Sequence, residues 1–201
     1  MRSISLLFVL CVSFVLVSCS SAPKVTRTDV DKTIDLSGHW NDSDSRMVAE
    51  AMIEQLIDAS WIMDYMKEKG AEPRVIVGSV INRSHEHVNV DTFVKDLEAQ
   101  LINSGKVSFV ADKQQRLEIR EEREDMLQGN TEPTTIKEKG HEIAADFMLQ
   151  GTVNSVKDEI EGKYVSYFQV NLELVDLSTN QKRWVGQHKV KKLVERRKFS
   201  W

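Results

Sequence analysis

Hydrophobic residues recur at steps of three and four between residues 47 and 66, a spacing that places them on one face of a helix. The run Asn41–Ser45 before them is rich in residues that cap helix N-termini, and Gly70 and Pro73 after them are typical of a helix end. The pattern therefore predicts a long amphipathic helix over about 44–68.

Short β-branched or alternating runs later in the chain predict strands. In 164–175 the apolar residues alternate with Gln169, Asn171 and Glu173, as in a strand with one buried face. The last three strands are joined by short turns at Glu161–Gly162 and Ser178–Asn180, so they form an antiparallel meander. The five expected strands are 74–81, 106–111, 147–156, 164–175 and 182–192, and the further expected helices are about 91–105, 112–127 and 134–145.

This order of elements predicts an α+β (mixed α/β) domain: a small sheet of four to five strands, mostly antiparallel, flanked by about four helices. The chain has 201 residues, of which 41% are hydrophobic and 29% charged, a balance that excludes wholesale disorder. The net charge of -4 and the pI near 5.8 argue against a general nucleic-acid binder. We expect one globular domain over 44–192 and a basic C-terminal tail over 193–201.

Residues 1–18 form a targeting segment. Arg2 precedes an apolar run over 4–17, which has the length of a signal-peptide core and falls short of the about 20 residues of a membrane span. An uncleaved anchor helix is the alternative. Leu16-Val17-Ser18-Cys19 resembles a bacterial lipobox, which implies cleavage before Cys19 and lipidation of Cys19. Two or more acyl chains, at about 0.8 kcal/mol per buried methylene, hold a protein on its membrane.

The residues after Cys19 indicate which membrane. Aspartate directly after the lipidated cysteine is the usual inner-membrane retention signal, and Ser20 stands there instead. We therefore expect an outer-membrane lipoprotein that faces the periplasm. Residues 19–43 are then the lipidated cysteine and a short polar tether. Cys11 leaves with the signal peptide, so no disulfide, zinc knuckle or cysteine nucleophile is expected in the folded part.

No group of residues indicates catalysis. His85-Glu86-His87 offers two imidazoles without a third metal ligand, so a solvated loop is expected there. His141-Glu142 lacks the second histidine of a zinc-protease helix, because position 145 is alanine. Ser79 lacks the second glycine of a nucleophile elbow, and no glycine-rich phosphate loop occurs. We expect no enzyme, no cofactor and no metal.

Charge is unevenly distributed near the C-terminus. Residues 181–201 hold eight basic residues and one acidic residue, whereas 112–146 hold ten acidic and six basic. The basic block either protects an edge strand from pairing or contacts an anionic partner, such as an acidic protein patch, peptidoglycan or lipid headgroups. The second alternative predicts four partner-binding residues: Lys191, Lys192, Arg196 and Arg197.

Taken in order, these features resemble the LpoB family of outer-membrane lipoproteins that activate peptidoglycan synthases. The resemblance covers most of 44–192, and Leu36–Ser45 is similar to a branch of the family outside the enteric bacteria. It rests on the lipobox at Cys19, the long first helix, the strand and loop Arg74–Ser84, the helix end Asn103–Lys106 with the strand Val107–Val110, and Leu174–Trp184 before the last strand.

The resemblance implies a small sheet flanked by helices, similar to the N-terminal domain of TolB and to part of CsgG, without catalysis. It also implies that the protein docks on a noncatalytic domain of a class A penicillin-binding protein. This docking raises the glycosyltransferase and transpeptidase activities of that synthase. Asn82, Arg83 and Ser84 match the family's first-strand loop and are expected on the functional surface. The enteric members have a long Pro-rich tether, whereas residues 20–35 contain only Pro23. A structural or assembly lipoprotein of a secretion or flagellar complex is the alternative function, and the oligomeric state is left open.

Overall fold

The computed structural model describes residues 25–137, 139–160 and 162–195. The chain divides into two units, Met1–Lys32 and Thr33–Trp201. In the described part of the first unit, Lys32 N donates to Asp29 O at 3.3 Å to close a turn. The predicted signal peptide, Cys19, Arg196 and Arg197 lie outside the described residues. Within those residues no helix has the length and apolar character needed to cross a bilayer.

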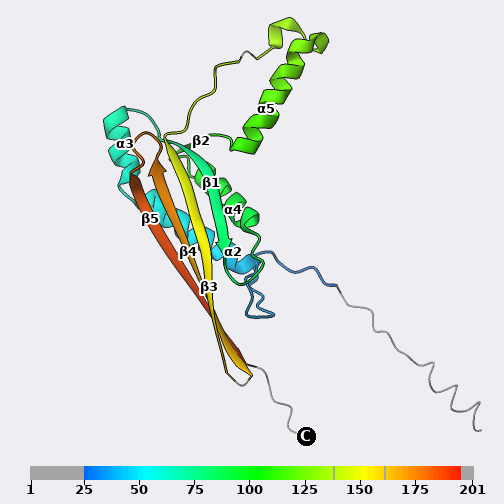
Figure 1. The fold of residues 1–201 in the computed structure, drawn as a ribbon, viewed down its shortest axis with the longest axis vertical. Helices are drawn as coiled ribbons and strands as arrows, with labels where there is room; N and C mark the ends of the chain where they lie inside the picture. The colour runs from blue at the N-terminus through cyan, green and yellow to red at the C-terminus, as the bar shows by residue number, and fades with distance from the viewer. Residues whose placement is uncertain (1–24, 138, 161, 196–201) are drawn as a thin grey trace, which may run out of the picture. The chain divides into compact units, whose positions relative to one another are not determined.

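The second unit contains a five-stranded mixed sheet in the order β2-β1-β3-β4-β5 (Figure 1). β1 pairs in parallel with β2 and β3, while the long β3–β4 and β4–β5 ladders are antiparallel. The predicted α+β fold class and the C-terminal meander are confirmed. The strands are β1 (Arg74–Arg83), β2 (Ser108–Phe109), β3 (Phe147–Ile160), β4 (Lys163–Asp176) and β5 (Lys182–Glu195).

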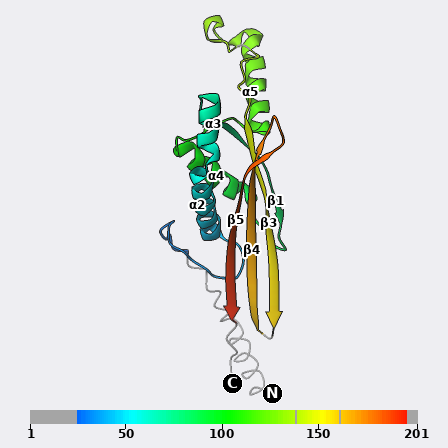
Figure 2. The ribbon, with the colours of Figure 1, turned by 90° about the vertical axis from the view of Figure 1, so that its left-hand side faces the viewer.

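Helices α2 (Asp42–Asp58), α3 (Trp61–Lys69) and α4 (Val90–Asn103) lie together on one side of the sheet (Figure 2). The alternation in β4 places Phe168, Leu172 and Leu174 on that side, where at most 1% of each is exposed. Burying such a side chain contributes roughly 1.5–3 kcal/mol, so this helix-covered face holds the core. The opposite face of the sheet, which we call the open face, carries no helix among the described residues.

The predicted long helix is wrong in one respect, because it is two helices. α2 ends at Ala59, whose extended backbone (ψ 150°) interrupts the helical path, and α3 starts at Trp61. Trp61 Nε1 donates to Leu56 O at 2.8 Å and so satisfies a carbonyl at the end of α2. The break lets Trp61 and Tyr65 pack edge-on against Phe147, at centroid distances of 5.2 and 5.3 Å.

The segment between β2 and β3 also differs from the prediction. The charged helix α5 (Lys113–Asp125) is confirmed, and it is followed by the π-type turn η1 (Met126–Asn130) and the 3-10 turn η2 (Pro133–Thr135). The predicted helix over 134–145 is wrong. Gly140, at φ 88°, takes a left-handed backbone conformation that does not continue a helix. The strand predicted over 106–111 shortens to β2.

The folded unit extends beyond the predicted domain limits at both ends. α2 begins at Asp42, and β5 continues to Glu195, three residues into the predicted basic tail. Residues 33–41, placed in the tether by sequence, belong to the second unit. The remaining division into signal peptide, tether, domain and tail stays a prediction.

We predict that Gly151→Ala destabilises the sheet by about 1–3 kcal/mol, the usual cost of overpacking. A Cβ at Gly151 would collide with the backbone oxygen of Asn171, which cannot move without breaking the β3–β4 ladder. Gly78→Ala is the control, because its Cβ would meet the flexible Met148 Sδ at 2.8 Å. Urea unfolding followed by circular dichroism measures both losses. A loss for Gly78→Ala equal to that for Gly151→Ala would contradict the argument.

Candidate functional site

Residues Thr33–Asn41, which we call the strap, pack against the ends of β4 and β5. Gly38 N donates to the Tyr164 hydroxyl at 3.4 Å. A Cβ at Gly38 would lie 2.7 Å from both Tyr164 Cε2 and Val194 Cγ2, so a larger residue there would have to displace these side chains. Trp40 packs edge-on against Phe168 with a centroid distance of 5.4 Å. The chain therefore enters the folded unit at the end of the sheet where β4 begins and β5 ends.

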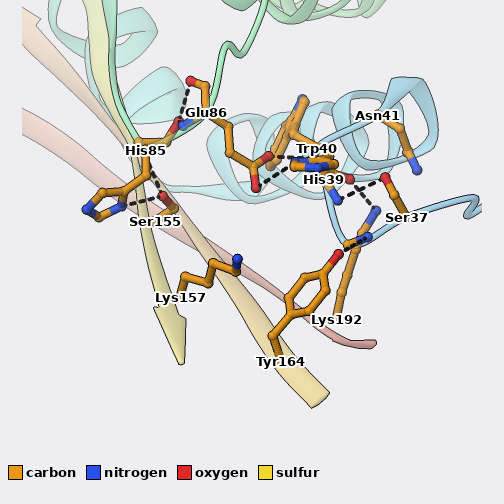
Figure 3. A network of polar contacts seen from close by, with 12 residues as sticks. Ser37, His39, Trp40, Asn41, His85, Glu86, Ser155, Lys157, Tyr164 and Lys192 are labelled. Carbon is orange, nitrogen blue, oxygen red and sulfur yellow. Dashed lines mark hydrogen bonds and ion pairs between the residues drawn. The ribbon is translucent and has the colours of Figure 1, made fainter. Parts of the chain in front are cut away.

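Lys192 is the centre of the polar network beneath the strap (Figure 3). Its Nζ lies 2.6 Å from Asp44 Oδ2 and 2.7 Å from Asp35 Oδ1, and it donates to His39 O at 3.1 Å. Only 11% of the Lys192 side chain and 3% of the Asp44 side chain are exposed. Burial acts to lower the pKa of Lys192, but the hydrogen bonds and charges of the two carboxylates outweigh it and raise that pKa.

The same carboxylates organise the start of α2. Asn41 N donates to Asp44 Oδ2 at 2.9 Å, and Asp44 N donates to Asn41 Oδ1 at 3.1 Å, which together form a capping box. Asn41 Nδ2 donates to Asp35 Oδ1 at 2.7 Å. The hydrogen bond from Lys192, and to a smaller extent the hydrogen bond from Asn41, lowers the pKa of Asp35. The network thus joins the strap, the first turn of α2 and β5.

Two of the predicted site residues, one at the end of β1 and one in the loop after it, have structural roles. Asn82 Nδ2 donates to Glu86 O at 2.8 Å, Ser84 N donates to Asn82 Oδ1 at 2.9 Å, and Ser84 Oγ donates to Glu86 O at 3.0 Å. The Glu86 carboxylate accepts from Trp40 N at 3.1 Å and pairs with His39 Nδ1 at 3.0 Å. Asn82 and Ser84 therefore shape a turn that presents Glu86 to the strap.

The described site residues separate into those bonded within the chain and those exposed on the open face. Lys192 was expected to meet an anionic partner, and in the structure its ammonium lies between two carboxylates of its own chain. Arg83 and Lys191 are exposed. Both occupy open-face positions, opposite Asn154 and Tyr167 in the ladders.

The open face carries a connected row of hydroxyl and amide groups that sequence reasoning did not single out. The Tyr167 hydroxyl donates to Gln169 Oε1 at 3.2 Å. Gln169 Nε2 at 3.0 Å and Gln187 Nε2 at 2.9 Å both donate to Asn171 Oδ1. These bonds hold the amide planes in fixed orientations. The available signal was the polar half of the alternation in β4 and β5.

A depression of about 250 Å³ lies beside this row on the open face. Arg83 contributes a cation, Glu173 contributes a carboxylate, and Gln150, Thr152 and Asn171 contribute uncharged polar groups. Its lining comes from β1, β3 and β4. The arrangement suits a polar protein surface, since it offers hydrogen-bond donors and acceptors and charges of both signs.

A second charged cluster lies away from the sheet, in the segment Asp112–Asp146, which we call the α5 arm. Glu142 accepts from Arg120 at 3.0 and 2.7 Å and from Arg123 at 2.8 Å. These three residues line a cavity of about 410 Å³ together with Glu124, Lys139 and Gly140. The hydrogen bond from Arg120, which outweighs the effect of burial, lowers the pKa of Glu142 to about 2. α5 has no buried residue and belongs to no core.

In the ranges 25–137, 139–160 and 162–195, no group of three or more His, Cys, Asp or Glu side chains could hold a metal ion. His85 N and His85 Nδ1 instead lie 2.9 and 3.2 Å from Ser155 Oγ on β3. The loop 85–87 is thus tied to the sheet through one of its histidines.

A sheet with one core face and one organised polar face defines a domain suited to binding another macromolecule. Residues 44–190 match the family model of the peptidoglycan-synthase activator LpoB. The chain belongs to the LpoB family, a family of synthase activators and not of catalysts. No curated protein matches the sequence.

Solved structures similar to this chain share little sequence with it. The LpoB C-terminal domain from Salmonella enterica is 15% identical, covers 70% of this chain and 96% of its own, and has a TM-score of 0.37. The NMR structure of Escherichia coli LpoB is 14% identical, with coverages of 90% and 85% and a TM-score of 0.41. Lipoprotein GNA1162 from Neisseria meningitidis is 17% identical, with coverages of 60% and 83% and a TM-score of 0.36.

We predict that Lys192→Met lowers the free energy of unfolding by about 3–5 kcal/mol, the usual cost of leaving one charge of a buried pair alone. The orphaned charge is Asp44. Lys191→Met, on the exposed neighbour, should change stability by no more than about 0.5 kcal/mol. The double variant Asp44→Asn/Lys192→Met should recover much of the loss, since no buried charge remains. Equal urea midpoints for Lys192→Met and Lys191→Met would refute the role of this network.

We predict that the contacts of Glu142 in the α5 arm persist in acid. Its pKa in the folded protein, about 2, lies below the ordinary value of 4.5. The stabilisation is therefore complete above pH 4.5 and is lost as the pH falls toward 2. A carboxyl-carbon NMR titration should place the Glu142 midpoint near 2. In Arg120→Gln the midpoint should rise toward the ordinary value, and an unchanged midpoint in that variant would exclude Arg120 as the cause.

Proposed function

We propose that this protein is a non-enzymatic lipoprotein, anchored in the outer membrane through Cys19 and facing the periplasm, that binds and activates a class A penicillin-binding protein. The observation that carries the proposal is membership of the LpoB family over 44–190. An activator of this kind raises output only if it binds the active conformation of the synthase more tightly than the resting one.

The open face is the docking surface that we propose for the synthase. Its amide and hydroxyl groups are already oriented by the Tyr167–Gln169–Asn171 hydrogen bonds, so little side-chain entropy is lost on binding. Arg83 beside them supplies a side chain type that is enriched in interfaces. Lys189 and Lys191 are exposed in open-face positions of β5 and would favour an acidic partner surface.

The five other predicted contact residues do not lie on the proposed docking surface as the structure describes it. Asn82, Ser84 and Lys192 act indirectly, by holding the loop and the strap in place. Arg196 and Arg197 lie outside the described residues and stay predicted contacts.

The proposed lipid anchor at Cys19 limits how far from the outer membrane this protein can bind the synthase. Thirteen residues, 20–32, separate Cys19 from the strap. They span at most about 45 Å when fully extended. The synthase domain that binds must therefore approach the outer membrane to within roughly the reach of this tether and the length of the folded unit.

We predict that Arg83→Glu and Lys189→Glu each weaken synthase binding about tenfold, equivalent to about 1.4 kcal/mol. The loss should be larger at low salt, because opposed charges are less screened there. Lys67→Glu is the matched control, since Lys67 is an exposed lysine on α3, across the sheet from the open face. Pull-down with the class A synthases of the same organism measures binding, and a glycan-chain assay measures activation.

Two outcomes of this experiment separate the function from the surface. If the parent protein neither binds nor changes the rate of any class A synthase, the proposed function is wrong. If the parent binds and all three charge reversals behave alike, the function stands and the open face is not the docking surface.

A further inference from the structure

The ends of β3, β4 and β5 next to the strap form what we call the ribbon tip: residues 156–160, 163–167 and 191–195. Three large apolar side chains are exposed there, with Val156 at 62%, Ile160 at 74% and Leu193 at 64%. Leu193 lies opposite Val165, which lies opposite Asp158, and Val156 lies two residues before Asp158 on the same face. The open face thus ends in a patch of exposed apolar side chains around one carboxylate, Asp158, while its centre is polar throughout.

The polar residues at the tip leave this patch close to neutral. Lys163 pairs with Glu195 at 2.6 Å, and Lys157 pairs with Glu159 at 2.9 Å. In sequence, β5 is followed directly by Arg196-Arg197-Lys198-Phe199-Ser200-Trp201. Apolar side chains next to basic and aromatic residues are the composition of segments that settle at a lipid headgroup boundary.

The path of the chain brings the same end of the sheet to the membrane anchor. The strap contacts Tyr164, Lys192 and Val194, all within the ribbon tip. These contacts are on the helix-covered side of the tip, and Leu36 of the strap is 92% exposed. The thirteen residues 20–32 lead from the strap back to Cys19. As a flexible coil they span only about 20 Å, so the tether keeps the tip at a high effective concentration near the bilayer.

We propose that the ribbon tip docks on the surface of the bilayer that holds the Cys19 acyl chains. Val156, Ile160 and Leu193 then lie in the boundary between headgroups and acyl chains. The tip is a second, reversible membrane contact that orients the domain, in addition to the covalent anchor. This inference rests on the lipid anchor of the proposed function and does not depend on the identity of the synthase.

The test uses the lipidated full-length protein, reconstituted into vesicles of phosphatidylethanolamine and phosphatidylglycerol. Lipidation blocks Cys19 and processing removes Cys11, so a cysteine introduced by Ile160→Cys is labelled selectively with an environment-sensitive nitrobenzoxadiazole dye. The emission of this label should shift to the blue and be quenched by lipids that carry a quencher in the upper acyl chain. A label at Gln128→Cys, on the exposed turn η1 of the α5 arm, should stay in water.

A charge placed in the patch should abolish docking. Leu193→Asp is expected to return the label at position 160 to an aqueous emission. Val185→Asp is the matched control, because Val185 is also on the open side of β5 and is 59% exposed, but pairs with Glu173 far from the tip. Both substitutions are at exposed positions, and circular dichroism verifies that both proteins fold.

Several results would overturn the inference. Lipid quenching at position 160 no greater than at 128, or quenching unchanged by Leu193→Asp, would exclude membrane docking of the tip. Shielding of the 160 label only after a class A synthase is added would assign the patch to a protein partner instead. Vesicle flotation separates this inference from the proposed function: protein that floats with an unquenched label retains the anchor, whereas protein that does not float has lost it.

Discussion

The buried ammonium of Lys192 is the interaction on which the arrangement of this domain depends. A lysine with 11% of its side chain exposed is stable only when carboxylates compensate the loss of water, and here Asp35 and Asp44 do so from two different segments. Asp44 also caps α2. A single charged group therefore fixes three things together: the path of the strap, the start of the first helix and the end of the last strand.

The periodic elements could be predicted from the sequence, and the non-local ones could not. Alternation over 164–175 identifies β4 and its buried face, because successive side chains of a strand point to opposite faces of the sheet. The break at Ala59 is invisible in the pattern, since apolar spacing continues through it. It is stabilised by the Trp61 indole on Leu56 O and by ring contacts with Phe147, eighty-six residues later in the chain. Contacts of that range leave no local signal.

The candidate site shows the same limit. Nothing local distinguishes Lys192 from Lys191, yet one lies under the strap and the other on the open face. Asn82 and Ser84 were expected on the functional surface because they match the first-strand loop of the family. Such side chains also bond neighbouring backbone, and here they build a turn. Arg83, between them on an alternating strand, points to the opposite face, and only its placement beside the depression follows the expectation of a binding residue.

The two faces of the sheet divide the work of the domain. The main hydrophobic core cluster lies on the helix-covered face, so the open face is free to carry polar groups that contribute little to this core. Its amide row is nevertheless bonded internally, which limits the motion that a partner would otherwise have to restrict. The strap adds a constraint of direction. Because the strap holds the entering chain at one end of the sheet, the lipid anchor that we propose would set the orientation in which a partner meets the open face. For an activator, a fixed orientation matters as much as affinity, because only binding that favours the active conformation of its partner changes that partner's rate.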